Sequence, residues 1–213
     1  MHLHSSMRTP VLALTALTAI LTAADSARPA VVAVDSGSVT FDVGTNISAV
    51  SVHGKSTGVR GSVRAKKDGA QLRLDEVTVS LAVDTLATGM SLRDEHMKKY
   101  IFTTSSNQMP ELRFTGGNYA CPMDSATGEA SCSFPGNLSI RGIEKPLSIW
   151  LKVKSSGSSY RAVGDGVVKL SDYGIERPSQ FGVKCAAEVK IHIEIQGKEI
   201  AVEFSSRLPG GVN

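Results

Sequence analysis

The most polar cluster of the sequence, and its best candidate for chemistry, is Arg93-Asp94-Glu95-His96. A histidine next to a carboxylate can transfer protons, so His96 and Asp94 could serve a hydrolase or isomerase that acts on a lipid-like substrate. One histidine with neighbouring carboxylates is a thin ligand set for a metal ion, and we predict no metal site. We favour a structural interpretation, in which Arg93 and Asp94 fix a loop and no reaction is catalysed, and keep the enzyme as the alternative.

The overall charge and the other motifs argue against several further classes of protein. The 213 residues carry 23 basic and 20 acidic side chains, a net charge of +3, and no run of Lys or Arg exceeds two residues. Such a weak and scattered charge does not predict binding to nucleic acid. The sequence contains neither a phosphate-binding loop nor a dinucleotide-binding fingerprint, so we expect no nucleotide cofactor.

The first 24 residues differ in kind from the rest of the chain. Residues 11–24 carry no charge, Arg8 precedes them, and the small pair Ala23-Ala24 closes them. This pattern predicts a secretory signal peptide over residues 1–24, with cleavage after Ala24 or after Ala27, and Met7 would be a more usual start than Met1. The apolar stretch is shorter than the roughly 20 residues that span a bilayer. We therefore expect a secreted or periplasmic mature chain without a stable membrane span; a buried core helix is the alternative.

Export would bring the three cysteines into an oxidising compartment. Cys121 and Cys132 flank a turn-rich stretch between two strand-like segments. We predict that they form a disulfide that closes a hairpin loop and stabilises it by roughly 3 kcal/mol, with two unpaired thiols as the alternative. Cys185 is left without an assigned partner.

Most of the remaining sequence has the pattern of β-strands. Residues 77–84, 147–154 and 189–196 alternate apolar and polar side chains, which indicates strands with one buried face. The alternation puts Trp150 and His192 on the outer face. Further strands are predicted over residues 31–43, 46–53, 58–67, 111–119, 130–141, 159–171 and 199–204. Gln196-Gly197-Lys198-Glu199 has the residues of a tight hairpin turn. Many short strands at near-regular spacing predict an all-β antiparallel sandwich or barrel.

One segment, from Thr88 to Phe102, loses the alternation. Ser91 could cap a short helix near residues 91–99, with Asp94 three residues later. Met90, Met97 and Ile101 recur at roughly helical spacing, so this helix is expected to pack over an end of the β structure.

Four motifs in order resemble the YceI-like polyisoprenoid-binding family. Asp84-Thr85, Gly89 and Arg93-Asp94-Glu95-His96-Met97 are similar to its Thr-Gly turn and Arg-Asp-x-His-Leu element. The other three motifs are Pro110-Glu111-Leu112-Arg113-Phe114, the segment from Gly136 to Leu147, and Ser171-Asp172-Tyr173-Gly174-Ile175. The resemblance runs from about Val34 to Ile195. Where the family usually has Asp-x-x-His-Ser, this chain reads Asp35-Ser36-Gly37-Ser38, and the stretch between Cys121 and Cys132 resembles an insertion.

The resemblance implies an extended, lipocalin-like antiparallel β-barrel of about eight strands over residues 31–205, followed by a C-terminal tail, 206–213. It also implies a long-chain isoprenoid, a quinone-like lipid or a similar amphiphile inside the barrel, for transport, storage or sequestration. A closed, packed barrel that acts as an interaction module stays possible, as does a homodimer.

The expected cavity-lining residues are the inward apolar side chains of the strands: Val77, Val79, Leu81, Val83, Phe114, Leu138, Ile140, Leu147, Ile149, Leu151, Ile191, Ile193 and Ile195. The expected structural residues are those of the turns and of the polar cluster: Asp84, Thr85, Gly89, Arg93, Asp94, His96, Gly142, Asp172 and Gly174.

Overall fold

The computed structural model describes residues 29–201 of the chain. The expected signal peptide (1–24) and C-terminal tail (206–213) lie outside the described residues. Within residues 29–201 no helix has the length and apolar character needed to cross a bilayer.

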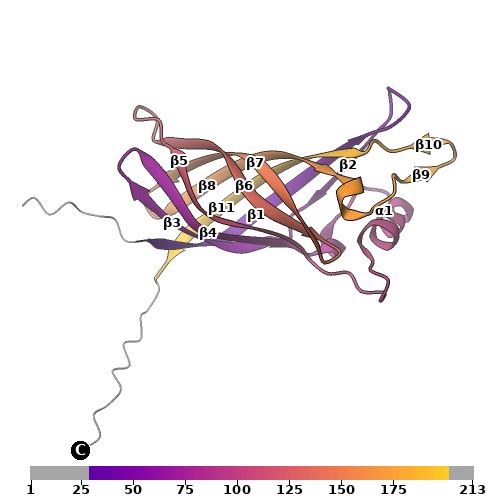
Figure 1. Cartoon of the computed structure of the whole chain (residues 1–213), viewed down its shortest axis with the longest axis horizontal. Coiled ribbons are helices and arrows are strands. Elements are labelled where there is room, and N and C mark those ends of the chain that lie inside the picture. Colours follow the sequence, from indigo (N-terminus) through magenta and orange to yellow (C-terminus); the bar gives the residue numbers. More distant parts are fainter. Residues whose placement is uncertain (1–28, 202–213) are drawn as a thin grey trace, which may run out of the picture.

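Eight long antiparallel strands close into a barrel, as the resemblance to the YceI-like family implies (Figure 1). Barrel strands that follow one another in the sequence pair with each other. The first and the last of them, β1 and β11, pair over eleven residue pairs and so close the barrel. The barrel strands are β1 (Ala30–Gly44), β3 (Val59–Asp68), β4 (Gln71–Leu81), β5 (Leu112–Pro122), β6 (Glu129–Ile140), β7 (Ile143–Ser156), β8 (Ser159–Lys169) and β11 (Glu188–Ile200).

The shorter elements gather at one end of this barrel. They are β2 (Ser51–Ser56), η1 (Val83–Thr85), α1 (Ser91–Met97), η2 (Lys98–Phe102), η3 (Leu170–Tyr173), β9 (Ser179–Gln180) and β10 (Val183–Lys184). Figure 1 shows α1 and the β9–β10 hairpin at this end, which we call the helix end, and the β3–β4 and β5–β6 turns at the opposite end, the turn end. Strand β2 extends the sheet beyond the barrel by pairing with the second half of β1.

The helix begins where the sequence predicts but is capped differently. Ser91 is its first helical residue and gives no side-chain cap; the capping position belongs to Met90. After α1 the chain continues as one turn of π-helix, η2, which ends at Phe102 and carries the helical segment past the expected residue 99. Met97 is buried, and Ile101 and Phe102 pack against the same apolar cluster. The segment therefore covers the helix end with apolar side chains.

The predicted hairpin at Gln196–Glu199 is wrong. Strand β11 runs unbroken through these residues, and Gly197 pairs with Val34 on one side and with Tyr160 on the other. A Cβ at Gly197 would lie 2.5 Å from the carbonyl oxygen of Ala33. The glycine thus marks a close approach of two backbones rather than a turn.

The apolar core is divided along the barrel. One cluster, with Leu72, Cys121 and Phe134 among its buried members, lies toward the turn end. Two further clusters fill the helix end: one joins Ile140 and Leu147 to η3, and the other joins Val59 and Leu81 to Leu86 and Met97. The interior of the helix end is therefore occupied by apolar side chains.

Candidate binding site

An apolar cavity of about 130 Å³ lies inside the barrel, between the middle and the turn end. All eight barrel strands contribute to its wall, and Tyr160 is the only residue of the wall with a polar group on its side chain. The lining residues are Val32, Val34, Val63, Ala65, Leu72, Leu74, Val77, Val79, Phe114, Phe134, Ile149, Leu151, Val153, Tyr160, Ala162, Gly164, Ile193, Ile195 and Gly197. Such a surface offers dispersion and hydrophobic burial, and no charge with which to bind or transform a polar substrate.

The structure brings seven of the thirteen expected lining residues to this cavity: Val77, Val79, Phe114, Ile149, Leu151, Ile193 and Ile195. The other six lie inside the barrel or under its end, and none of them lines this cavity. Leu138, Ile140, Leu147 and Ile191 belong to the cluster around η3 or pack against it. Leu81 lies in the cluster beneath α1, and Val83 is buried in η1, beyond the end of β4.

The single polar group of the wall is itself hydrogen-bonded. The hydroxyl of Tyr160 donates to the carboxylate of Glu199 at 2.8 Å. Burial, reinforced by this acceptor, raises the pKa of Tyr160 to about 12. The phenol is therefore neutral at physiological pH, and the cavity wall carries no charge.

The polar cluster at the start of α1 forms a closed hydrogen-bond network. The Asp94 carboxylate accepts bonds from the backbone N–H and the hydroxyl of Thr88, and the Arg93 guanidinium donates to the hydroxyl and carbonyl oxygens of Thr88. Partial burial would raise the pKa of Asp94, but the bonds from Thr88 outweigh it, and nearby positive charges help to lower the pKa. This network ties Thr88, in the loop before α1, to the first turn of the helix.

The pair that the alternative enzyme would use, His96 and Asp94, is not assembled. Among the described residues no hydrogen bond or ion pair joins His96 to Asp94, whose carboxylate is occupied by Thr88. The His96 ring instead meets the edge of Tyr100, with ring centroids 5.7 Å apart. A proton relay needs its base within hydrogen-bond reach of its partner, and this geometry does not provide it.

The family model of the YceI-like domain matches residues 30–197, which covers nearly all of the described chain. This chain belongs to the YceI-like family. A UPF0312 protein of Pseudomonas aeruginosa is 28% identical over 129 residues, and one of Pseudomonas syringae pv. tomato is 27% identical over 117 residues. These matches cover 58% and 52% of this chain and 62% and 58% of the relatives, so they span less than two thirds of either relative.

Two solved structures share the barrel. A polyisoprenoid binding domain from Saccharophagus degradans, implicated in plant cell wall breakdown, aligns with a TM-score of 0.60 and 15% identity, over 81% of this chain and all of that one. BcnA of Burkholderia cenocepacia aligns with a TM-score of 0.56 and 17% identity, over 75% of this chain and 95% of its own. At these identities the likeness establishes the fold.

The nine expected structural residues of the turns and of the polar cluster lie at the helix end, and none of them lines the cavity. Asp84 and Thr85 form η1, and Thr85 is hydrogen-bonded to Ser56 and to the carbonyl oxygen of Ala82. Asp172 lies in η3. The three glycines of the set, Gly89, Gly142 and Gly174, have φ values of +82°, +79° and +63°, which other residues rarely adopt. These positions shape the turns that close this end of the YceI-like barrel.

A disulfide joins Cys121 and Cys132, as the sequence predicts. Strands β5 and β6 pair over only three residue pairs, from Arg113–Ser139 to Thr115–Asn137, and then separate. The two buried cysteines, 5.2 Å apart between Cα atoms, reconnect the strands beyond that point. The disulfide thus fastens the part of the YceI-like barrel wall where the backbone ladder is missing.

One further motif has the spacing of a hydrolase nucleophile elbow, Gly54-Lys55-Ser56-Thr57-Gly58. An elbow requires a strand followed by a helix, with the serine exposed between them. Here Ser56 ends β2, leads into β3 and is 2% exposed. Its hydroxyl accepts the N–H of Gly58 and is bonded to Thr85. The serine is a structural link between β2 and η1.

The outer face of the barrel carries two exposed histidine–carboxylate pairs. His53 lies 2.8 Å from Asp42, and His192 lies 2.8 Å from Asp165 and 3.5 Å from Glu194. The hydrogen bond with Asp165 raises the pKa of His192. These pairs border an open groove of about 690 Å³, which is lined by parts of β1, β2 and β11 together with residues 87–89 and Asp165. Within residues 29–201 no group of three or more His, Cys, Asp or Glu side chains could hold a metal ion.

Proposed function

We propose that this YceI-like domain binds a long-chain isoprenoid or a similar amphiphilic lipid in its barrel cavity, without transforming it. The uncharged wall, built from all eight strands, is the observation that carries the proposal. The structural neighbour from Saccharophagus degradans, described as a polyisoprenoid binding domain, supports the same class of ligand. Each buried isoprene unit of about 100 Å² would contribute roughly 2–3 kcal/mol before ordering costs.

The size of the cavity narrows the choice of ligand. Its volume of about 130 Å³ is well below the roughly 300–1,000 Å³ of pockets that enclose drug-sized molecules. A single slender chain fits this space better than a ring system or a two-chain lipid. A full-length isoprenoid would also need space that side chains of the helix end now occupy, so binding would be coupled to movement of the packed clusters there.

The proposed place of action is outside the cytoplasm, where the lipid would be transported, stored or sequestered. The uncharged stretch at residues 11–24 and the Cys121–Cys132 disulfide both support export, because disulfides persist in oxidising compartments. A catalytic role is less favoured, because Asp94 is engaged by Thr88 and makes no bond with His96.

Mass spectrometry of lipids extracted from protein purified without detergent tests the proposal. We expect a co-purifying single-chain isoprenoid or quinone-like lipid, close to one molecule per barrel. Protein that contains no lipid and takes up no added prenol, while its cavity stays empty in a crystal structure, would rule the proposal out.

A further inference from the structure

Exposed apolar side chains are concentrated on the loops of the helix end. Among the described residues, eleven large hydrophobic side chains are exposed, and seven of them belong to the loops, short helices and β9–β10 hairpin of this end. Met90 and Leu92 lie at the start of α1, Tyr100 in η2, Met109 in the loop after it, and Phe181 at the tip of the β9–β10 hairpin. The other two, Ile47 and Val50, lie on the β1–β2 loop. These segments come from distant parts of the sequence and project from the same end of the barrel (Figure 1).

Phe181 is the most exposed member of this set, at 95%, and its backbone is strained. Phe181 and Gly182 connect β9 to β10 with φ values of +50° and +80°, as in a type I′ turn. The first central position of that turn favours Asn, Asp or Gly, and a bulky residue there is uncommon. The hairpin therefore bears a backbone cost to present an aromatic ring that gains no burial within the fold, which points to a contact outside the fold.

Basic residues accompany the apolar tips. Residues 88–104 and 176–186 contain five basic and three acidic side chains, a net charge of +2. Asp94 and Arg93 are both bonded to Thr88, so their network leaves the excess of basic over acidic side chains unchanged. Lys99 lies with its Nζ 5.4 Å from the centre of the Tyr100 ring. Long basic side chains beside aromatic rings suit the boundary between apolar chains and anionic head groups.

We propose that the helix end docks on an anionic lipid bilayer, with Phe181 and the neighbouring apolar tips inserted among the head groups. The tips are single side chains on separate loops, which suits a deformable lipid surface better than a partner protein, whose interface would require a contiguous packed core. This inference rests on the proposed function for its biological sense, since a bilayer is where an isoprenoid would be collected or delivered. The docking end is also the end that α1 and η2 close.

Sedimentation with vesicles of phosphatidylcholine and phosphatidylglycerol tests docking with the full mature chain. We expect the wild-type protein to sediment with these vesicles, and less with phosphatidylcholine alone. Phe181→Asn should weaken binding at least about tenfold, because it removes the largest inserted side chain. The same substitution suits the turn, so its melting temperature should equal or exceed that of the wild type.

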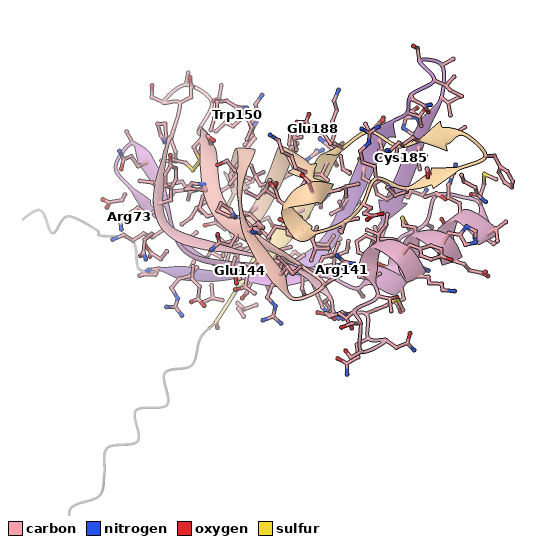
Figure 2. The ribbon with its side chains drawn as sticks, turned by 45° about the vertical axis from the view of Figure 1, so that its right-hand side comes forward. Arg73, Arg141, Glu144, Trp150, Cys185 and Glu188 are labelled. Carbon is pink, nitrogen blue, oxygen red and sulfur yellow. A yellow bond between two sulfur atoms is a disulfide. The ribbon has the colours of Figure 1, made fainter. Side chains whose placement is uncertain are left out.

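Trp150→Ser is the matched control. Trp150 is 52% exposed on the outer wall of β7, away from the docking end (Figure 2), so its loss should leave vesicle binding unchanged. Wild-type protein that stays in the supernatant, or equal losses in the two variants, would overturn the docking proposal. Uptake of prenol from detergent solution is measured in parallel. Protein that takes up prenol but ignores vesicles refutes docking alone, and protein that binds vesicles but takes up no prenol refutes the cavity proposal alone.

Discussion

The carboxylate of Asp94 accepts two hydrogen bonds from Thr88, one from the backbone N–H at 2.7 Å and one from the hydroxyl. These bonds join residues six apart in the sequence and close the loop that leads into α1. They hold the start of the helix in place of a side-chain cap, which Met90 at the capping position does not provide. Because Arg93 binds the same threonine, the start of the helix is fixed from two directions.

Asp94→Ala is expected to destabilise the fold by about 1 kcal/mol, since the Thr88 N–H and hydroxyl lose a charged acceptor. Thermal unfolding followed by circular dichroism measures the change. Glu95→Ala is the control: its exposed neighbouring carboxylate has no hydrogen bond or ion pair within residues 29–201. Equal melting temperatures for the wild type and Asp94→Ala would show that the network contributes nothing to stability.

Acid should weaken the same network. The pKa of Asp94 is lower in the folded protein than its ordinary value near 4, so the unfolded chain binds the proton more tightly. The stabilisation is complete above the unfolded-state pKa and is lost as the pH falls through the folded-state pKa. In urea titrations at a series of pH values, Asp94→Asn should flatten the acid limb of the stability curve relative to the wild type. Parallel curves would contradict the assignment.

The disulfide should be worth roughly 3 kcal/mol, because it closes a loop of eleven residues in sequence separation. The double variant Cys121→Ala/Cys132→Ala tests this by chemical denaturation. Cys185→Ala provides the control, because Cys185 is a free thiol and its loss removes no cross-link. If the double variant and the control unfold at the same denaturant concentration, the cross-link does not stabilise the barrel wall.

His96→Ala is expected to leave lipid content unchanged and to lower stability by less than about 1 kcal/mol, through the lost edge contact with Tyr100. Melting curves and lipid extraction from the purified variant measure the two quantities. If the wild-type protein converts a lipid and His96→Ala abolishes this activity, the enzyme hypothesis is supported instead.

Alternation predicts most of the barrel strands because it is a local property of a strand with one buried face, whereas the closed barrel is what the resemblance to the YceI-like family implies. The sequence does not reveal where the alternation changes phase. On β4, Arg64 pairs with Glu76 and Ala65 with Leu74, so Asp75 is an extra residue between them. Regular alternation extended from Val77 toward the start of β4 would place the Asp75 side chain inside the barrel. In the structure Leu72 and Leu74 point inward instead and line the cavity. Only the register with β3 shows this bulge.

The division of the interior is also beyond local patterns. Leu147 and Leu151 lie on the same inward face of β7, yet Leu147 is packed in the cluster around η3 and Leu151 lines the cavity. The difference arises from which elements close the helix end. The wrong hairpin prediction at Gly197 has a similar cause. The sequence alone does not distinguish a glycine that permits two backbones to approach closely from a glycine that permits a turn.

The most direct test of the account places a larger side chain in the cavity and measures lipid binding. Ala162 lines the cavity, and Ala162→Leu adds three carbon atoms to a space of about 130 Å³. Val167→Leu, on the exposed outer face of the same strand, is the control. With both variants shown to be folded by their melting curves, native mass spectrometry titrates each with a long-chain prenol. We predict that Ala162→Leu binds at least about tenfold more weakly than the wild type and Val167→Leu binds equally well; wild-type affinity in folded Ala162→Leu would contradict the cavity as the binding site.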